Sequence, residues 1–168
     1  KKEKDKISDI QKINKKEKDK ALQDAKEYYP QLDEHMLNSH KNMRLKIQLW
    51  YQQNHQCPYS DTEIQMEDLI NNPDKYEIDH IIPRSISHNN SINNKVLCLK
   101  TENQLKRQSS PYQYLNEKQW TRFKSSVKDL YKNKKIKAAK LGLLLKEDDI
   151  NKWESQREFI SRNLVDTR

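Results

Sequence analysis

The chain has 168 residues, with 33 Lys and Arg against 25 Asp and Glu, and its formal net charge is +8. This excess of basic residues suits a polyanion such as nucleic acid, although a lysine-rich solvated surface explains the composition equally well. The single glycine, Gly142, nearly excludes a glycine-rich phosphate loop or a dinucleotide-binding fold, because both need several glycines at fixed spacing.

The first 30 residues are dense in Lys, Glu and Asp and contain few large apolar residues. We predict a charged, solvated helical linker over residues 1–30, ended by Pro30. A second helix is expected from about His35 to Gln53, because apolar residues repeat there at spacings of four and three. The predicted buried stripe of this helix, which includes a packed core histidine, consists of Met36, His40, Met43, Ile47 and Trp50.

Two short strands followed by a helix are predicted in the middle of the chain. Apolar runs at Tyr76–Ile82 and Lys95–Lys100 indicate the strands, and a polar loop over 83–93 separates them. Thr101 and Gln104 match a capping box, which predicts a helix with Thr101 as its N-cap. We therefore expect an α+β fold, with a mostly helical domain around a small ββα unit and a two-stranded antiparallel sheet.

The last third of the chain is predicted to be helical, with two buried stripes and a basic run between them. The basic run over 132–137 contains four lysines. A solvated helix end and a phosphate-contacting loop explain this run equally well. The first stripe is Trp120, Phe123, Val127 and Leu130, and the second is Trp153, Ile160 and Leu164.

Cys57 and Cys98 do not lie in the close Cys/His pairs that structural zinc sites use, so we expect buried free thiols in a reducing compartment. The chain begins without Met and shows no secretory signal. It also has no apolar run near the roughly 20 residues that span a bilayer. We therefore expect a segment of a longer cytoplasmic protein that has no membrane partner.

The residues with the clearest chemistry are Asp79 and His80, in the first predicted strand, and Asn103, in the helix after the second. Histidine titrates near neutrality, so His80 can take a proton from an attacking water. Asp79 and Asn103 offer the oxygen ligands that Mg²⁺ prefers, and the three together suit a metal-assisted phosphodiesterase. Because successive strand residues point to opposite faces, Asp79 and His80 can share a site only if the strand twists, bulges or ends there.

Three more residues complete the predicted site. Asn94 stands directly before the second strand, where it can hold the His80 loop by hydrogen bonds or serve only as a turn residue. Lys106 and Arg107 follow Asn103 by three and four positions. Helical spacing brings both near the face that carries Asn103, so we predict that they contact phosphate groups.

Longer motifs around these residues resemble the HNH nuclease domain of the RNA-guided endonucleases of type II CRISPR systems, the Cas-nine family, and especially its shorter members. The resemblance covers most of residues 35–168. The motifs that carry it are Tyr76–Ser85, Asn89–Leu97, Thr101–Asn103, Ser110–Leu115 and Arg162–Arg168.

The resemblance implies a role for each site residue. His80 is the expected general base, and Asn94 completes the catalytic set as the middle Asn of the motif. Asp79 and Asn103 are the expected ligands of Mg²⁺, for which Mn²⁺ can substitute. Asn103 stands where many other HNH nucleases carry His.

The resemblance also implies a domain organisation, a substrate and binding partners. The expected domains are a charged helical linker over 1–30, an HNH nuclease domain of the ββα-metal type over 31–150, and a C-terminal helical linker over 151–168 toward a RuvC-like domain. The expected substrate is the target DNA strand paired to guide RNA. The guide RNA, held by the parent protein, and the other domains of the same chain are the expected partners.

Two other interpretations remain open at this point. A free-standing HNH homing or restriction nuclease would cut duplex DNA by itself and would carry its own element for reading DNA. A basic module that binds nucleic acid without catalysis would use Asp79 and His80 only as structural residues.

Overall fold

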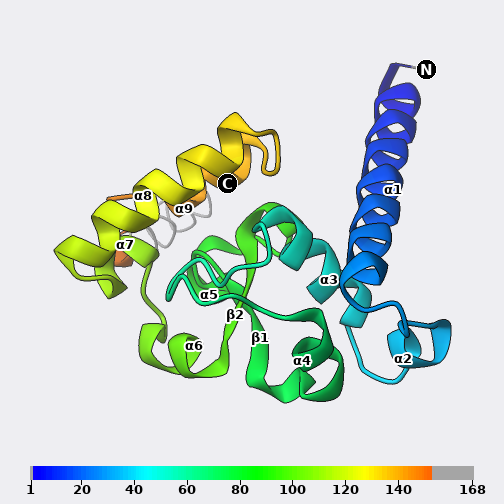
Figure 1. The fold of residues 1–168 in the computed structure, drawn as a ribbon. Helices are drawn as coiled ribbons and strands as arrows, with labels where there is room; N and C mark the ends of the chain where they lie inside the picture. Colours follow the sequence, from blue (N-terminus) through cyan, green and yellow to red (C-terminus); the bar gives the residue numbers. More distant parts are fainter. Residues whose placement is uncertain (1, 153–168) are drawn as a thin grey trace.

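Residues 2–152, which the computed structural model describes, form a mostly helical structure around one antiparallel pair of strands (Figure 1). This arrangement confirms the α+β fold expected from the sequence. None of the helices in this range is both long and apolar enough to cross a membrane. The elements are α1 (Lys2–Tyr28), α2 (Glu34–Asn38), α3 (Met43–Gln52), α4 (Met66–Asn71), η1 (Pro73–Lys75), β1 (Tyr76–His80), α5 (Arg84–Ser87), η2 (Ile92–Asn94), β2 (Lys95–Leu99), α6 (Lys100–Lys106), α7 (Pro111–Tyr114), α8 (Glu117–Lys132) and α9 (Ala138–Leu144).

The two strands pair along their whole length, and a side chain beside α3 completes the open edge of β2. His80 lies opposite Lys95 in the antiparallel register. The side chain of Gln53 accepts a hydrogen bond from the Leu97 backbone N–H at 2.7 Å and donates one to the Leu97 carbonyl at 2.8 Å. A two-stranded sheet is at best marginally stable alone, so these contacts and the packing of α3 against β2 hold it in place.

One face of α8 is buried along the helix, which confirms the first predicted stripe. Phe123 is fully buried, and its ring stacks on the Tyr59 ring with centroids 6.0 Å apart. Cys57 and Cys98 are buried free thiols, as expected. The buried residues of the α8 stripe are Trp120, Phe123, Val127 and Leu130. The second predicted stripe, Trp153, Ile160 and Leu164, lies outside the described residues.

Helix α1 is an arm whose C-terminal half packs on the rest of the molecule and whose N-terminal half projects away from it (Figure 1). Ala21 and Ala25 are buried against the body, whereas Ile7, Ile10 and Ile13 remain more than half exposed. The charged helix predicted for the start of the chain is therefore present, and its last turns contribute to the core.

The single helix predicted from His35 to Gln53 is wrong, because the chain breaks between α2 and α3. Asn42 adopts a left-handed conformation with φ of 65°, which a helix interior cannot contain and which asparagine tolerates better than most residues. His40 lies in this break. It is half-buried and its Nε2 is 3.3 Å from Asp74 Oδ1, so it is not the packed core histidine that we expected.

The segment around the strands also differs from the sequence prediction. The first strand ends at His80 instead of Ile82, and the expected polar loop over 83–93 contains the short helices α5 and η2. The capping box at Thr101 is wrong. Helix α6 follows β2 without a break, so Leu99 is the N-cap and Thr101 already lies in the first turn. The described capping boxes lie further along the chain, at Ser110–Gln113 and Asn116–Gln119.

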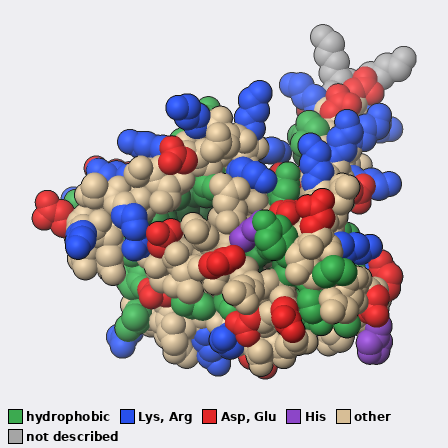
Figure 2. All heavy atoms as spheres, in the orientation of Figure 1, with side chains coloured by type: hydrophobic (Ala, Val, Ile, Leu, Met, Phe, Trp, Pro, Cys, Tyr) green, Lys and Arg blue, Asp and Glu red, His purple; other side chains and the backbone are tan. Residues whose placement is uncertain are grey.

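Basic side chains are spread over the surface. Figure 2 shows Lys and Arg side chains along α1 and α8, with acidic side chains among them. The basic run over 132–137 begins at the last residue of α8 and continues into the following turn, where Lys135 Nζ lies 3.7 Å from the centroid of the Tyr51 ring. On this face the positive charge is distributed, and a phosphate-contacting role for the run remains a prediction.

A buried lysine connects α9 to α3. Lys140 is 2% exposed, and its Nζ donates a hydrogen bond to Gln52 Oε1 at 2.6 Å. Gln52 in turn donates to Glu17 Oε1 of α1 at 2.6 Å. Burial lowers the pKa of Lys140 to about 7, although the Glu17 carboxylate acts in the opposite direction. The interior at this point therefore disfavours the ammonium form.

This burial predicts a pH dependence of stability. Between about pH 7 and the ordinary lysine pKa of 10.5, the unfolded chain binds a proton at Lys140 that the folded chain does not. The free energy of unfolding should therefore rise with pH across this window, by up to about 1.4 kcal/mol per pH unit. Urea unfolding from pH 6.5 to 9.5 measures the slope. Lys140→Met should lose this rise, and Lys137→Met, at an exposed position, should keep it; equal slopes in all three proteins would contradict the prediction.

Candidate active site

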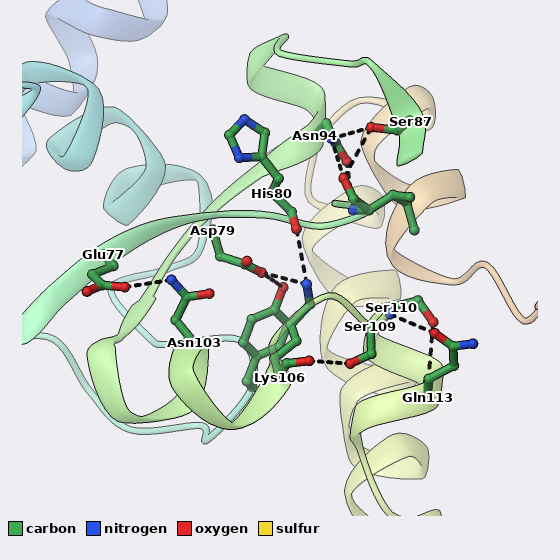
Figure 3. A network of polar contacts seen from close by, with 12 residues as sticks. Glu77, Asp79, His80, Ser87, Asn94, Asn103, Lys106, Ser109, Ser110 and Gln113 are labelled. Atoms are coloured by element: carbon green, nitrogen blue, oxygen red, sulfur yellow. Dashed lines mark hydrogen bonds and ion pairs between the residues drawn. The ribbon is translucent and has the colours of Figure 1, made fainter. Parts of the chain in front are cut away.

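Asp79 and His80 project from opposite sides of β1 (Figure 3). The Asp79 carboxylate lies on the buried side, where the residue is 6% exposed, whereas the His80 ring lies on the more open side. This is the alternation that strand geometry requires of neighbouring residues. The structure therefore does not bring the carboxylate and the imidazole to one side of the strand, and the two side chains meet different surroundings.

The Asp79 carboxylate is held by two donors from elsewhere in the chain. Its Oδ2 accepts a hydrogen bond from the Tyr59 hydroxyl at 2.7 Å and lies 3.1 Å from Lys106 Nζ. Burial raises the pKa of Asp79, while the Lys106 ammonium acts to lower it. Burial and the nearby Asp79 carboxylate raise the pKa of Tyr59 well above its usual value, so its hydroxyl remains a donor.

Lys106 is not at the surface, where we expected a phosphate contact. Its side chain is 0% exposed, and its Nζ also donates to the His80 carbonyl at 3.0 Å. The reason is that α6 packs against β1 and turns position 106 toward the strand. Arg107 lies just after α6 with φ of 52° and is exposed, so of the two predicted phosphate contacts only Arg107 is open to solvent here.

The His80 ring contacts the loop between the strands. Its Nε2 lies 2.9 Å from the side-chain oxygen of Asn90. If the ring carries its proton on Nε2, this contact is a hydrogen bond donated by the imidazole. The other ring nitrogen, Nδ1, then has a lone pair that can accept a proton.

Asn94 forms the hydrogen bonds to the His80 loop that the sequence suggested. It is fully buried, and its Oδ1 accepts from the Ile82 N–H at 3.0 Å. Its Nδ2 donates to the carbonyls of Ile82 at 2.9 Å and Asn89 at 2.8 Å, and lies 3.4 Å from Ser87 Oγ. From the last position before β2, this side chain thus holds the start and the middle of the loop that follows His80.

Asn103 lies on the same side of β1 as Asp79 (Figure 3). Its Nδ2 donates to Glu77 Oε2 at 2.6 Å, and Glu77 precedes Asp79 by two strand positions. Within residues 2–152 no group of three or more His, Cys, Asp or Glu side chains could hold a metal ion. The carboxylate oxygens of Asp79 and the amide oxygen of Asn103 are nevertheless hard donors, which suit a cation that keeps several of its waters. The Lys106 ammonium, next to Asp79, shows that a positive charge is already accommodated at this carboxylate.

Three residues of the site were not predicted from the sequence. Glu77 could have been found, since the period of a strand puts it on the face of Asp79. Tyr59 lies 20 positions before Asp79, and no local pattern connects the two. Asn90 is one of several asparagines in a polar loop, and nothing in the sequence distinguishes it as the contact of His80.

Residues 57–112 match a family model described as HNH endonuclease, and all four predicted catalytic and metal-binding residues lie in that range. The chain is 42% identical, over 99% of its length, to the CRISPR-associated endonuclease Cas9 1 of Streptococcus thermophilus, and 48% identical, over 73% of its length, to Cas9 of Staphylococcus aureus. A crystal structure of Streptococcus thermophilus Cas9 in complex with an AGGA PAM has a TM-score of 0.80 and 38% identity over 99% of this chain.

The fold and the matched residues define the class: residues 57–112 belong to the HNH endonuclease family, and the chain along its length is similar to Cas9 proteins. Within that class it is related to one region of Cas9. The chain spans 15% and 12% of the two curated relatives and 16% of the structure it matches.

The role of Asn94 can be tested through stability. Asn94→Ala removes the side-chain partner of the Ile82 N–H and of the half-buried Asn89 carbonyl, and one of the two donors to the Ile82 carbonyl. We therefore expect the free energy of unfolding to fall by about 2–5 kcal/mol. Urea unfolding measures this loss. Asn93→Ala is the matched control, because Asn93 makes none of these hydrogen bonds, and its effect should stay within about 0.5 kcal/mol. Equal effects of the two substitutions would contradict the role of Asn94.

Proposed function

We propose that this chain is the HNH nuclease domain of a Cas9-like protein and hydrolyses a phosphodiester bond in the target DNA strand paired to guide RNA. The observation that carries the proposal is the arrangement around β1 within the matched range. Asp79 and Asn103 lie on one side of the strand, and His80 extends from the other with its loop held by Asn94. These are the residue types that a metal-assisted hydrolysis needs.

His80 acts as the general base in this proposal and takes a proton from the attacking water. Asn94 holds the loop after His80 and so limits the positions that the imidazole can adopt. Asp79 and Asn103 hold Mg²⁺, or Mn²⁺ in its place, through their side-chain oxygens. When bound, the ion supplies charge stabilisation to the phosphate and the leaving 3′-oxygen.

The substrate must reach both sides of β1, since Asp79 and His80 diverge. We therefore expect the scissile phosphate at the His80 end of the strand, where the regular pairing stops. Arg107 is exposed just after α6 and is our candidate for a contact to a flanking phosphate.

The longer protein supplies recognition in this proposal. Guide RNA pairs with the target strand and so selects the sequence, while the HNH domain meets only the backbone of the heteroduplex. We propose a linker over 1–30, the nuclease domain over 31–150 and a second linker over 151–168 that leads to a RuvC-like domain. The similar proteins come from bacteria, so we propose the bacterial cytoplasm as the place of action.

Similarity to one region of a much longer enzyme favours this proposal over a free-standing HNH nuclease. The match to Cas9 1 runs along 99% of this chain but covers only 15% of that protein. A non-catalytic basic module would leave unexplained why Asp79, His80, Asn94 and Asn103 all fall within the HNH match.

Substitution of the proposed base tests the mechanism. In the longer protein loaded with guide RNA, His80→Ala should slow cleavage of the guide-paired strand by about 100- to 10,000-fold, since that is the usual contribution of a general base. A single-turnover assay with a labelled target strand measures the rate. The matched control is His88→Ala, at an exposed position eight residues later, which should cleave at the wild-type rate. Wild-type cleavage by His80→Ala would refute the assignment.

The isolated chain should be a poor nuclease. Docking onto the heteroduplex by the longer protein supplies the positioning that the chain lacks, so we expect it to cut a preformed guide RNA–DNA duplex at least about 100-fold more slowly than the parent. Single-turnover rates of the two proteins at saturating concentration make the comparison. Equal rates, or efficient cutting of ordinary duplex DNA by the chain alone, would instead indicate a free-standing nuclease.

A further inference from the structure

We propose that Lys106 is the built-in counter-ion of the metal position beside Asp79, and that a divalent cation binds there by displacing it. This inference rests on the proposed function, since it takes Asp79 and Asn103 as the metal ligands. It goes further by giving Lys106 a positioning role that links the two sides of β1.

The first observation is that the ion pair between Asp79 and Lys106 is almost completely buried. The side chains of Asp79 and Lys106 are 7% and 0% exposed, and their charged atoms lie 3.1 Å apart. A carboxylate this deeply buried needs a positive partner, because an unpaired buried charge is strongly destabilising. The fold provides that partner from α6, while Tyr59 donates to the same carboxylate oxygen at 2.7 Å. The Oδ2 oxygen of Asp79 therefore already has two donors before any metal ion arrives.

The second observation concerns what this carboxylate can hold. A divalent ion bound to an Asp79 oxygen would stand about 2.1 Å from it, on the carboxylate that already holds the ammonium. Two cations beside one buried carboxylate repel each other strongly, since the interior screens charge poorly. Lys106 is the last residue of α6, and its ammonium ends a flexible four-carbon stem. Rotation of this side chain can withdraw the ammonium without unfolding the helix.

The third observation is that Lys106 also contacts the backbone of His80, so replacing Lys106 by a metal ion would affect His80. The Lys106 ammonium donates to the His80 carbonyl at 3.0 Å as well as pairing with Asp79. Displacement by a cation therefore removes a hydrogen bond from the backbone that carries the proposed base. The Lys106 ammonium thus connects Asp79, on the proposed metal side of β1, to the backbone of His80, although the side chains of Asp79 and His80 point to opposite sides of the strand (Figure 3).

The first test compares the Mn²⁺ affinity of the 168-residue chain with that of its Lys106→Gln variant, with no nucleic acid present. Electron paramagnetic resonance of the free ion measures the affinity. Gln removes the competing charge, so we expect tighter binding by a factor of roughly 5–150, the usual range of coupling between two ligands. A lysine that only supported the fold would give no gain. Unchanged or weaker binding overturns the exchange, as does tighter binding by the charge-conserving control Lys106→Arg.

Asp79→Asn separates the exchange from the proposed function. If this variant loses Mn²⁺ binding while Lys106→Gln gains nothing, the exchange is wrong and the ligand assignment stands. If Mn²⁺ binds to Asp79→Asn as tightly as to the wild-type chain, the ligand assignment itself is wrong, and the exchange falls with it.

A second measurement uses the unaltered chain and does not depend on whether a variant folds. Lys106 and Lys140 are 1% and 2% exposed, so both should resist acetylation by acetic anhydride. We expect saturating Mn²⁺ to raise the acetylation rate of Lys106, followed by mass spectrometry, and to leave Lys140 unchanged. Equal protection of Lys106 with and without the ion overturns the proposal. A parallel rise at Lys140 would indicate general loosening and overturns it too.

Discussion

The buried ion pair between Asp79 of β1 and Lys106 of α6 is the interaction on which the site depends. Removing one partner of such a pair leaves a charge in the interior and typically costs about 3–5 kcal/mol. The Tyr59 hydroxyl also donates a hydrogen bond to Asp79, and the His80 carbonyl accepts one from Lys106. The pair therefore fixes α6 against β1 and determines where Asn103, on the same helix, lies relative to Asp79.

The strand itself creates two environments from adjacent residues. On one side the buried Asp79 and the half-buried Glu77 face α6, where Lys106 pairs with Asp79 and Asn103 donates a hydrogen bond to Glu77. On the other side His80 meets a polar loop whose backbone is held by the buried Asn94. With the roles proposed for these residues, a site divided in this way keeps the proposed base apart from the proposed oxygen ligands until a substrate bridges them. In the proposed function, that bridge is the phosphate of the target strand.

The sequence predicted those features that follow from local periodicity. The spacing of Trp120, Phe123 and their neighbours predicted a buried face, and strand alternation predicted the divergence of Asp79 and His80. Features that depend on tertiary packing were not predictable. Helical spacing grouped Lys106 with Asn103, but it could not say that this side of α6 packs onto β1. The helical spacing of apolar residues also continued across Asn42, so it predicted one helix there. Hydrophobic spacing carries no information about the left-handed backbone of Asn42, which divides that helix in two.

The most direct test of the account is to locate a divalent ion by anomalous scattering in crystals of the chain soaked with Mn²⁺. We expect a peak bonded to an Asp79 carboxylate oxygen and to the Asn103 amide oxygen, with the Lys106 ammonium withdrawn from its place beside Asp79. A peak bonded elsewhere, with the pair between Asp79 and Lys106 intact, would contradict it.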